Sequence, residues 1–478
     1  MRVSEHFHLN RTQPELDFVD VDIYGDVRAF VDPRALRLLR TDWGQECVFL
    51  VQDFFSTVLR AIQENRSDDA RKMLAAIREP NETHLGYSSG VARGRALGAQ
   101  SAEHVGDALA RSEAAKSGLL EDLEDTILMV EGVSIDLISD ITTCLIRRQL
   151  VDYTQSVAGE YGIPLSPGVP SGPLWDPLRH EWNDSEFHPL PITPSGRLLL
   201  LPKAIVRRKL EYSQEEYYRD YIVEYLRESE IAANGELVQL LKDGTPRVTR
   251  KSIEMKYGAG KATIVATTLK EPALLDRYRK AKVGRPSSPL LHADFAELTG
   301  TEEPDWDQLL SSVSAVTAGQ EGATAYHNAV ERILTSLLYP SLAWPKMEFP
   351  IHDGRKRIDI TYENISTSGF FNWVCQHYVV PLVFVECKNY SGDPGNPELD
   401  QLGGRFSPRR GQVGLLLCRG FADKALFVDR CRDTAADGRG YIVPLDDQDL
   451  AQLAEEVKAE PGGREYRLLA ERFQELIR

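Results

Sequence analysis

A run of apolar residues that ends abruptly in charge constrains the fold more than any other part of the sequence. The segment Pro381–Tyr390 reads PLVFVECKNY, and its nearly continuous apolar stretch is typical of a strand buried on both faces of a sheet. Residues two apart on a strand share a face, so Glu386 and Lys388 point the same way and Cys387 points to the opposite side. The sequence therefore predicts that an acid and an ammonium group meet in one site.

Two further segments carry acids that can join this site. Apolar residues recur at helical spacing over Tyr326–Leu338, which predicts a helix that ends near Pro340 and carries Glu331 at the edge of its apolar stripe. Residues 354–362 (GRKRIDITY) change from a basic, hairpin-like tip into a strand in which Asp359 stands between two isoleucines. If this strand lies beside the first one, two carboxylates and a lysine converge.

Such a group of charges inside an apolar sheet needs a counter-ion, and a divalent cation is the natural one. Mg²⁺ takes hard oxygen ligands, which two carboxylates and a backbone carbonyl can supply, and Mn²⁺ is the alternative ion. The predicted metal-binding positions are Asp359, Glu386 and Cys387. A bound ion polarises a phosphate and acidifies a water, and Lys388 would orient that water and offset the developing negative charge.

The order of these residues resembles that of a nuclease superfamily. A helix with Glu331, the spacing G-x-x-x-x-D that ends at Asp359, and E-x-K from Glu386 to Lys388 are similar to the PD-(D/E)XK superfamily, most of all to its Mrr-type branch. The resemblance covers residues 325–453. It implies that Asp359 and Glu386 hold the metal, that Lys388 assists the attacking water, and that the helix glutamate is an auxiliary acid.

The resemblance also implies a fold and an activity. We expect an α/β fold, α+β overall, in which a restriction-endonuclease-like mixed β-sheet flanked by helices follows a mainly helical N-terminal region. The implied function is a metal-dependent endonuclease that hydrolyses phosphodiester bonds of DNA, in a prokaryotic restriction or anti-phage defence role. One departure from the family is the separation of 27 positions between Asp359 and Glu386, and we expect residues 366–378 to project as a loop.

The E-x-K pattern alone is weak evidence, because the chain contains it three times. The copy at Glu254–Lys256 follows a polar, basic stretch, and the copy at Glu456–Lys458 lies in an amphipathic helical pattern. The structural alternative for Glu386–Lys388 is a salt-bridge group at the end of a sheet. The structural alternative for Glu331 is a solvated residue at a helix edge.

Proline and apolar periodicity divide the rest of the chain. Residues 1–163 are predicted as a mainly helical domain in which Leu16–Ile23 and Val27–Val31 form a short β-hairpin. Residues 164–300 are predicted as a proline-rich connector followed by a basic α/β region, because eight of the 26 prolines fall in the first part of this segment. The remaining parts are a linker at 301–322, with at most one short helix near residues 306–316, and the nuclease-like domain at 323–478.

Charge confines any contact with nucleic acid to local patches. The chain has 56 basic and 72 acidic side chains and a formal charge of −16, which argues against a uniformly basic coat. Residues 242–285 nevertheless hold twelve basic residues against four acids, which predicts either a phosphate-binding surface or, equally, a solvated face that pairs with acids of the same protein. The predicted nucleic-acid-binding residues, here and beside the E-x-K strand, are Arg250, Lys251, Lys256, Lys261, Arg355, Lys356, Arg357, Arg409 and Arg410.

Composition also limits the class of protein and its partners. Six scattered cysteines without zinc-ligand spacing exclude a disulfide scaffold and indicate a reduced compartment. The polar N-terminus and the short apolar runs predict a cytoplasmic protein with no membrane contact. The expected partner is nucleic acid, with DNA favoured over RNA, and a homodimer or a partner subunit stays open. The alternative function is a catalytically inactive nuclease-like module that binds nucleic acid or acts as a regulatory scaffold.

Overall fold

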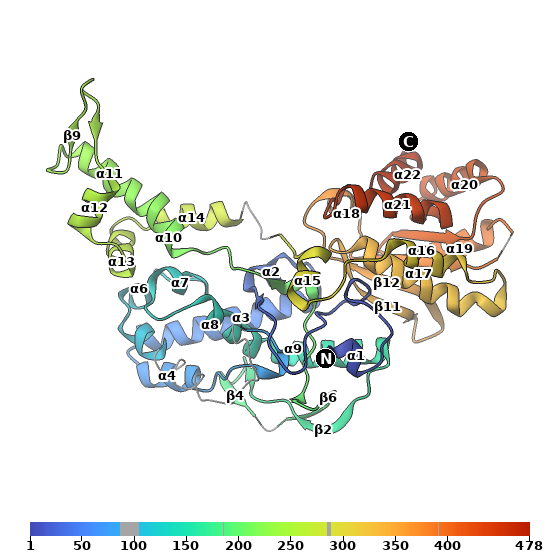
Figure 1. Cartoon of the computed structure of the whole chain (residues 1–478), viewed down its shortest axis with the longest axis horizontal. Helices are drawn as coiled ribbons and strands as arrows, with labels where there is room; N and C mark the ends of the chain where they lie inside the picture. The colour runs from blue at the N-terminus through green and yellow to red at the C-terminus, as the bar shows by residue number, and fades with distance from the viewer. Residues whose placement is uncertain (87–104, 185, 284–287, 391) are drawn as a thin grey trace.

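The computed structural model describes residues 1–86, 105–184, 186–283, 288–390 and 392–478. The molecule is elongated, with a helical protrusion at one end and a large β-sheet at the other (Figure 1). One hydrophobic core gathers the N-terminal region, and a second core surrounds the sheet. Within the described ranges, every helix is too short or too polar to cross a lipid bilayer.

Helices dominate the first part of the chain, as predicted. The long helix α3 (Asp42–Gln63) begins after Thr41, whose side chain accepts a hydrogen bond from Gly44 N. Its apolar residues repeat every three or four positions, so one face is buried, with Phe54 and Val58 inaccessible to solvent. This region also contains α1 (Val3–His6), α2 (Pro33–Leu38), α4 (Ser67–Ala75), α6 (Glu113–Lys116), α7 (Asp125–Met129), α8 (Ile135–Leu145) and α9 (Arg147–Tyr161).

The hairpin expected between Leu16–Ile23 and Val27–Val31 does not form. Instead, β1 (Phe30–Val31) pairs antiparallel with β8 (Val206–Arg207). The first segment of the expected hairpin lies beside the end of the buried run Leu198–Leu201: Val19 N donates to the carbonyl oxygen of Leu201, and Phe18 forms an antiparallel bridge with Pro202. A distant apolar run therefore replaces the local partner, because burying it removes more apolar surface from water.

The proline-rich segment forms short antiparallel strand pairs that share the N-terminal core. These pairs are β2 (Ser166–Pro170) with β5 (Phe187–Leu190), β3 (Leu174–Asp176) with β4 (Glu181–Asn183), and β6 (Ile192–Thr193) with β7 (Gly196–Arg197). Trp175 and Leu190 are buried in the same core as α3. This core therefore continues across residue 163, where the sequence placed a boundary.

Residues 214–283 form the protrusion, drawn in green in Figure 1. Its elements are α10 (Gln214–Tyr217), the π-helical turn η4 (Tyr218–Ile222), α11 (Val223–Ala232), β9 (Gln239–Leu240), β10 (Pro246–Arg247), α12 (Arg250–Tyr257), α13 (Lys261–Lys270) and α14 (Ala273–Val283). Tyr217, Ile264 and Tyr278 are fully buried and hold these elements together. Strands contribute only the short β9–β10 pair here, so the region predicted as α/β is mainly helical.

The C-terminal part is built on a five-stranded mixed sheet, as expected. In spatial order the strands are β11 (Leu342–Ile351), β12 (Lys356–Asn364), β13 (Leu382–Lys388), β14 (Val413–Cys418) and β15 (Tyr441–Asp446). β11, β12 and β13 are antiparallel to one another in turn, whereas β14 and β15 run parallel to β13. Residues 383–385 of the central strand β13 are completely buried, which confirms the prediction from its apolar run.

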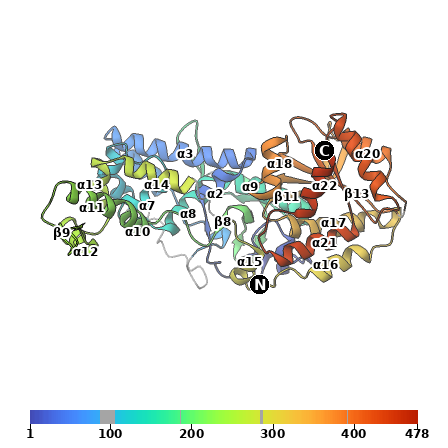
Figure 2. The same cartoon turned by 90° about the horizontal axis from the view of Figure 1, so that it is seen from above.

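Helices pack on this sheet and join it to the N-terminal region. Helix α17 (Ala323–Leu338) packs against β11, β12 and β13, and α20 (Lys424–Ala436) and α22 (Arg467–Ile477) pack against β15. Trp344 at the start of β11 packs on Tyr153 of α9 and on Trp43, so the N-terminal core reaches this edge of the sheet (Figure 2). Other helices here are α15 (His292–Thr299), α16 (Trp306–Ser314), α18 (Gly369–His377), α19 (Asn396–Gly403) and α21 (Asp447–Ala459).

Two connecting segments differ from the expectation. The insert expected to project as a loop contains α18, whose Phe370, Phe371 and Val374 are buried in the core around the sheet. The segment expected as a linker contains the one short helix expected there, α16, but its Leu309 and Val313 are buried in the same core. In both segments a short apolar stripe at helical spacing outweighs the polar and small residues around it.

Candidate active site

Three carboxylates lie in one row across three neighbouring strands. The register of β11 and β12 places Glu348 opposite Asp359. The register of β12 and β13, continued by one residue beyond the pair Ile360 and Val385, places Glu386 opposite Asp359 as well. Opposite residues of antiparallel strands project from the same face of a sheet. The two strands therefore pair across the insert, and they bring the predicted acids together.

Asp359 also connects β12 to the end of β13. Its Oδ2 accepts a hydrogen bond from Cys387 N at 2.8 Å. The Cys387 side chain is buried, and this burial, with the nearby charge of Asp359, raises the pKa of its thiol well above the ordinary value. The thiol therefore stays protonated, and the predicted role of Cys387 in metal binding depends on its backbone carbonyl alone.

Glu386 is a fully buried carboxylate with two cationic partners. Its Oε1 accepts a hydrogen bond from Lys388 Nζ at 2.8 Å, and its Oε2 forms an ion pair with Arg405. Lys388 Nζ also donates to Gln401 Oε1 on α19 at 3.2 Å. Because an unpaired buried charge is costly, these two cations allow Glu386 to remain ionised inside the sheet.

Arg405 is a residue of this site that the sequence did not place beside Glu386. It lies just after α19, and its side chain is 9% exposed. Burial lowers the pKa of its guanidinium, and the charges of Asp359 and Glu348 oppose that change. A guanidinium nevertheless stays protonated in proteins. Part of the counter-charge that the sequence assigned to a metal ion is therefore supplied by an arginine.

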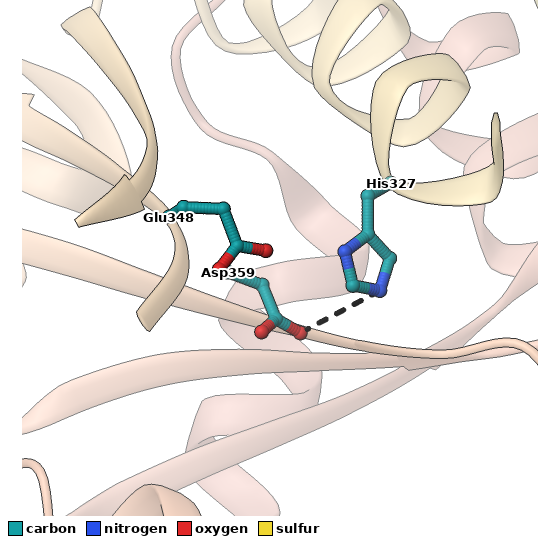
Figure 3. A group of neighbouring side chains, drawn as sticks. All are labelled: His327, Glu348 and Asp359. Atoms are coloured by element: carbon teal, nitrogen blue, oxygen red, sulfur yellow. Dashed lines mark ion pairs between the residues drawn. The ribbon is translucent and has the colours of Figure 1, made fainter. Parts of the chain in front are cut away.

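His327 approaches Asp359 from helix α17 (Figure 3). Its Nε2 lies 3.8 Å from Asp359 Oδ2. One ligand atom from each of His327, Glu348 and Asp359 can be chosen so that all three lie within 4.8 Å of one another. Imidazole nitrogen and carboxylate oxygen are common ligands of divalent ions, so this donor set fits a metal ion. Sequence reasoning did not identify His327 or Glu348 as site residues. Glu348 could have been found, because a turn at the hairpin tip fixes the strand register that places it opposite Asp359.

Glu331 lies one helical turn after His327 but makes a different contact. Its Oε2 lies 2.6 Å from Arg11 Nη2, and its Oε1 accepts a hydrogen bond from Thr335 at 3.0 Å. The side chain is only 3% exposed, so it is not the solvated helix-edge residue of the alternative reading. The predicted auxiliary acid is thus paired with the N-terminal segment, and it is His327 on this helix that faces Asp359.

One of the predicted nucleic-acid-binding residues lies beside the row of carboxylates: Arg357 pairs with Glu348 at 3.7 Å. Arg355 and Lys356 at the tip of the β11–β12 hairpin, and Arg409 before β14, are also exposed. Arg410 is partly buried and donates a hydrogen bond to the carbonyl oxygen of Arg405 at 3.1 Å, so it supports the loop that carries Arg405. The exposed cations can contact a phosphate backbone that passes the sheet edge.

The second predicted basic group, on the protrusion, is largely engaged in internal contacts. Arg250 and Lys256 each form an ion pair with a glutamate at 2.6 Å. Lys261 is buried and donates to two backbone carbonyls within residues 130–133, so it is not available to nucleic acid, contrary to the expectation. Lys251 is exposed. Three of these four predicted residues therefore make contacts within the chain, whereas other basic residues of the segment, such as Lys242, Arg247 and Lys270, are exposed.

Comparison with known proteins concerns the N-terminal region. Residues 8–213 match a family described as a domain of unknown function (DUF8370). The search of curated proteins and the search of solved structures each gave no match. The family match ends before β11, so it does not include the carboxylate row.

Proposed function

We propose that residues 323–478 form a metal-dependent endonuclease domain that hydrolyses phosphodiester bonds of DNA. The observation that carries this proposal is the placement of Asp359 and Glu386 opposite each other on adjacent strands, with Lys388 hydrogen-bonded to Glu386. Two acids at the end of a buried strand can hold a metal ion that activates a water, and a lysine beside them can offset the negative charge that develops on a phosphate. The order of these residues and their strand context agree with the family resemblance, which adds support.

The side chains fit a divalent cation by their chemistry. Asp359 offers a carboxylate oxygen and Cys387 a backbone carbonyl, whereas both oxygens of Glu386 already contact Lys388 and Arg405, so Glu386 would hold the ion only by exchanging one of these contacts. When bound, such an ion polarises a phosphate and lowers the pKa of a coordinated water. Lys388, 14% exposed and fixed by two hydrogen bonds, would hold its ammonium group where negative charge develops on the phosphate.

The rest of the chain would position or control this domain. Arg357 supplies exposed positive charge beside Glu348, and Arg355, Lys356 and Arg409 are exposed on the same domain, which suits a DNA backbone. The N-terminal region holds helix α17 through Arg11 and Glu331, one turn from His327. We propose that this region senses or gates the nuclease domain, in a restriction or anti-phage defence role.

A cleavage assay with two lysine variants tests the proposal. Full-length wild type should nick plasmid DNA and cut single-stranded DNA in Mg²⁺ or Mn²⁺, and Lys388→Ala should lower the rate by about 100-fold or more. The matched control is Lys458→Ala, which changes the lysine of another E-x-K sequence on α21. Equal cleavage by wild type and Lys388→Ala, or no cleavage by wild type in either metal, would contradict the proposal.

The placement of Arg405 favours a second candidate. An arginine that neutralises Glu386 makes a metal unnecessary for the stability of the site. The domain would then be a nuclease-like module that binds nucleic acid or a partner without hydrolysis. Titration calorimetry with Mg²⁺ or Mn²⁺ and DNA-binding assays in EDTA separate the two functions. Only the nuclease needs to bind a metal ion at the carboxylate row.

A further inference from the structure

The carboxylate row contains two electrostatic groups with different requirements. Glu386 is matched by Lys388 and Arg405, so it has the cations that a buried carboxylate needs. Asp359 and Glu348 form a second group with His327, in which two acids face one imidazole. The second group is therefore the one to which a divalent cation adds most.

We propose that His327, Glu348 and Asp359 together bind one divalent transition-metal ion, with Mn²⁺ preferred over Mg²⁺. The inference rests on the proposed function in one respect, because the ion would serve the same hydrolytic site. It differs from the sequence-based expectation in two of its three ligands. Glu386 stays with Lys388 and Arg405 beside the ion and does not hold it.

The nature of the donors determines which ions the site prefers. Mg²⁺ binds oxygen ligands and requires a nearly ideal octahedron, so a neutral imidazole nitrogen is a poor ligand for it. Imidazole suits the divalent transition metals, whose sites commonly combine histidine with carboxylates. The nitrogen of His327 therefore discriminates against Mg²⁺, whereas a site of carboxylates alone would not.

Exposure and backbone geometry are consistent with a binding site that is open on one side. The side chains of His327 and Asp359 are 17% and 14% exposed, whereas that of Glu348 is 53% exposed. Glu348 has a left-handed backbone with φ of 49°, unusual within a strand for a residue other than glycine. One face of the group is accessible to water or a phosphate, as a catalytic metal site requires.

The contacts that these ligands make within the protein can be exchanged for a metal. Glu348 pairs with Arg357 at 3.7 Å, but both side chains are more than half exposed, so the pair contributes little. His327 lies 3.8 Å from Asp359, which is longer than a hydrogen bond. The three ligand atoms need to approach by about 1–2 Å to reach the spacing around a bound ion.

Electron paramagnetic resonance of Mn²⁺ in solution tests the inference without relying on cleavage. Titration of the full-length protein should remove one equivalent of free Mn²⁺ signal per chain, and Mg²⁺ should compete only at a large excess. His327→Ala and Glu348→Ala should each weaken Mn²⁺ binding by about 10-fold or more, because each removes a ligand. His377→Ala, an exposed histidine of α18, is the matched control and should bind as the wild type does.

Mn²⁺ affinity that is unchanged in His327→Ala, or no site-dependent binding in the wild type, would overturn the inference. Circular dichroism of each variant checks that it is folded, and Asp359→Asn gives the loss expected for a ligand near the centre of the row. If DNA is cut but His327→Ala binds Mn²⁺ normally, the inference fails and the proposed function stands. If binding depends on His327 but no DNA is cut, the inference stands and the proposed function fails.

Discussion

At the scale of single residues, two neighbouring carboxylates differ in what balances their charge. Glu386 is buried between Lys388 and Arg405, whereas Asp359 accepts one backbone hydrogen bond and faces His327. Coulomb attraction in a poorly solvated site is strong, so the residue with fewer cations gains more from a bound ion. The location of a metal therefore depends on these partners as much as on the acids themselves.

Asp140 makes stability depend on pH at a place remote in sequence from the carboxylate row. Burial, together with the nearby carboxylates of Asp136, Glu79 and Asp26, raises the pKa of Asp140 to about 8. The folded protein holds the Asp140 proton more tightly than the unfolded chain does. The free energy of unfolding is therefore highest, as far as Asp140 is concerned, below about pH 4, and it falls as the pH rises from about 4 to about 8. Asp140→Asn should therefore be more stable than wild type at pH 8, by on the order of 2 kcal/mol.

Urea unfolding at pH 5 and pH 8 measures this effect, and the gain in Asp140→Asn should be clearly smaller at pH 5. Asp152→Asn on α9 is the control, because that carboxylate is exposed and its replacement should have the same small effect at both values. An equal gain for Asp140→Asn at pH 5 and pH 8 would mean that Asp140 titrates normally in the folded protein.

Residue-level reasoning from the sequence recovered part of the candidate site. Strand alternation was sufficient to place Glu386 and Lys388 on one face, and the isoleucines around Asp359 were sufficient to put it on a strand. The role of His327 and the pairing of Arg405 with Glu386 were missed because they depend on how a helix and a loop pack on the sheet. The local sequence around either residue does not predict that packing.

At the scale of elements, the register of the β11–β12 hairpin could have been predicted further than it was. A turn at residues 352–355 pairs Ile351 with Lys356, and counting back along the two strands pairs Glu348 with Asp359. The helix α18 was harder to predict. Only three of its nine residues are buried. Contacts such as that of Phe370 with Phe473 of α22 are what stabilise so short a helix.

The start of α18 gives a prediction at this scale. Gly369 has φ of +69°, and a Cβ there would overlap the carbonyl oxygen of Arg464, which accepts a hydrogen bond from Phe370 N at 2.8 Å. Gly369→Ala should therefore lower the free energy of unfolding by about 2–3 kcal/mol, through backbone strain and overpacking. Calorimetric melting measures the loss.

Gly420→Ala is the control for this measurement, because nothing lies within 4 Å of a Cβ at that position and its backbone is not left-handed. It should melt within about a degree of wild type. If Gly369→Ala melts at the same temperature as the control, the contact of the start of α18 with Arg464 does not contribute to stability, and the prediction is wrong.

At the scale of the whole molecule, the N-terminal segment is fastened to the first helix and the first strand of the sheet. Arg11 pairs with Glu331 on α17, and Asp17 Oδ1 accepts a hydrogen bond from Trp344 N on β11 at 2.9 Å. Glu160 Oε2 accepts another from Met347 N at 3.1 Å. Movement of the N-terminal region would therefore be transmitted to the elements that carry His327 and Glu348.

Glu331→Gln separates this structural contact from a role in the site. The variant should lose about 2 kcal/mol of stability, because it leaves a mostly buried Arg11 without its partner. It should keep the Mn²⁺ affinity of wild type within about 2-fold, since the carboxylate is not a ligand in this account. Urea unfolding and Mn²⁺ titration of the same preparation measure both. A 10-fold loss of Mn²⁺ affinity with unchanged stability would place Glu331 in the metal site instead.

The sequence predicted less of the whole molecule than of the sheet. The mixed sheet was expected from the family resemblance. The helical character of residues 1–163 and the buried strand β13 follow from local periodicity. The continuation of the N-terminal core through the proline-rich strands does not, because it depends on contacts between segments more than 100 residues apart, such as Trp175 with Asp53. Contacts between distant segments, unlike a helix or a strand, do not require apolar residues at any fixed spacing in the sequence.

Anomalous diffraction from crystals of the full-length protein grown with Mn²⁺ tests the central claim most directly. The claim is that this edge of the sheet is a metal centre for phosphodiester hydrolysis. We predict one strong anomalous peak, about 2.2 Å from His327 Nε2 and from carboxylate oxygens of Glu348 and Asp359, with Lys388 adjacent. A map with no peak at the carboxylate row, at saturating Mn²⁺, would contradict the claim.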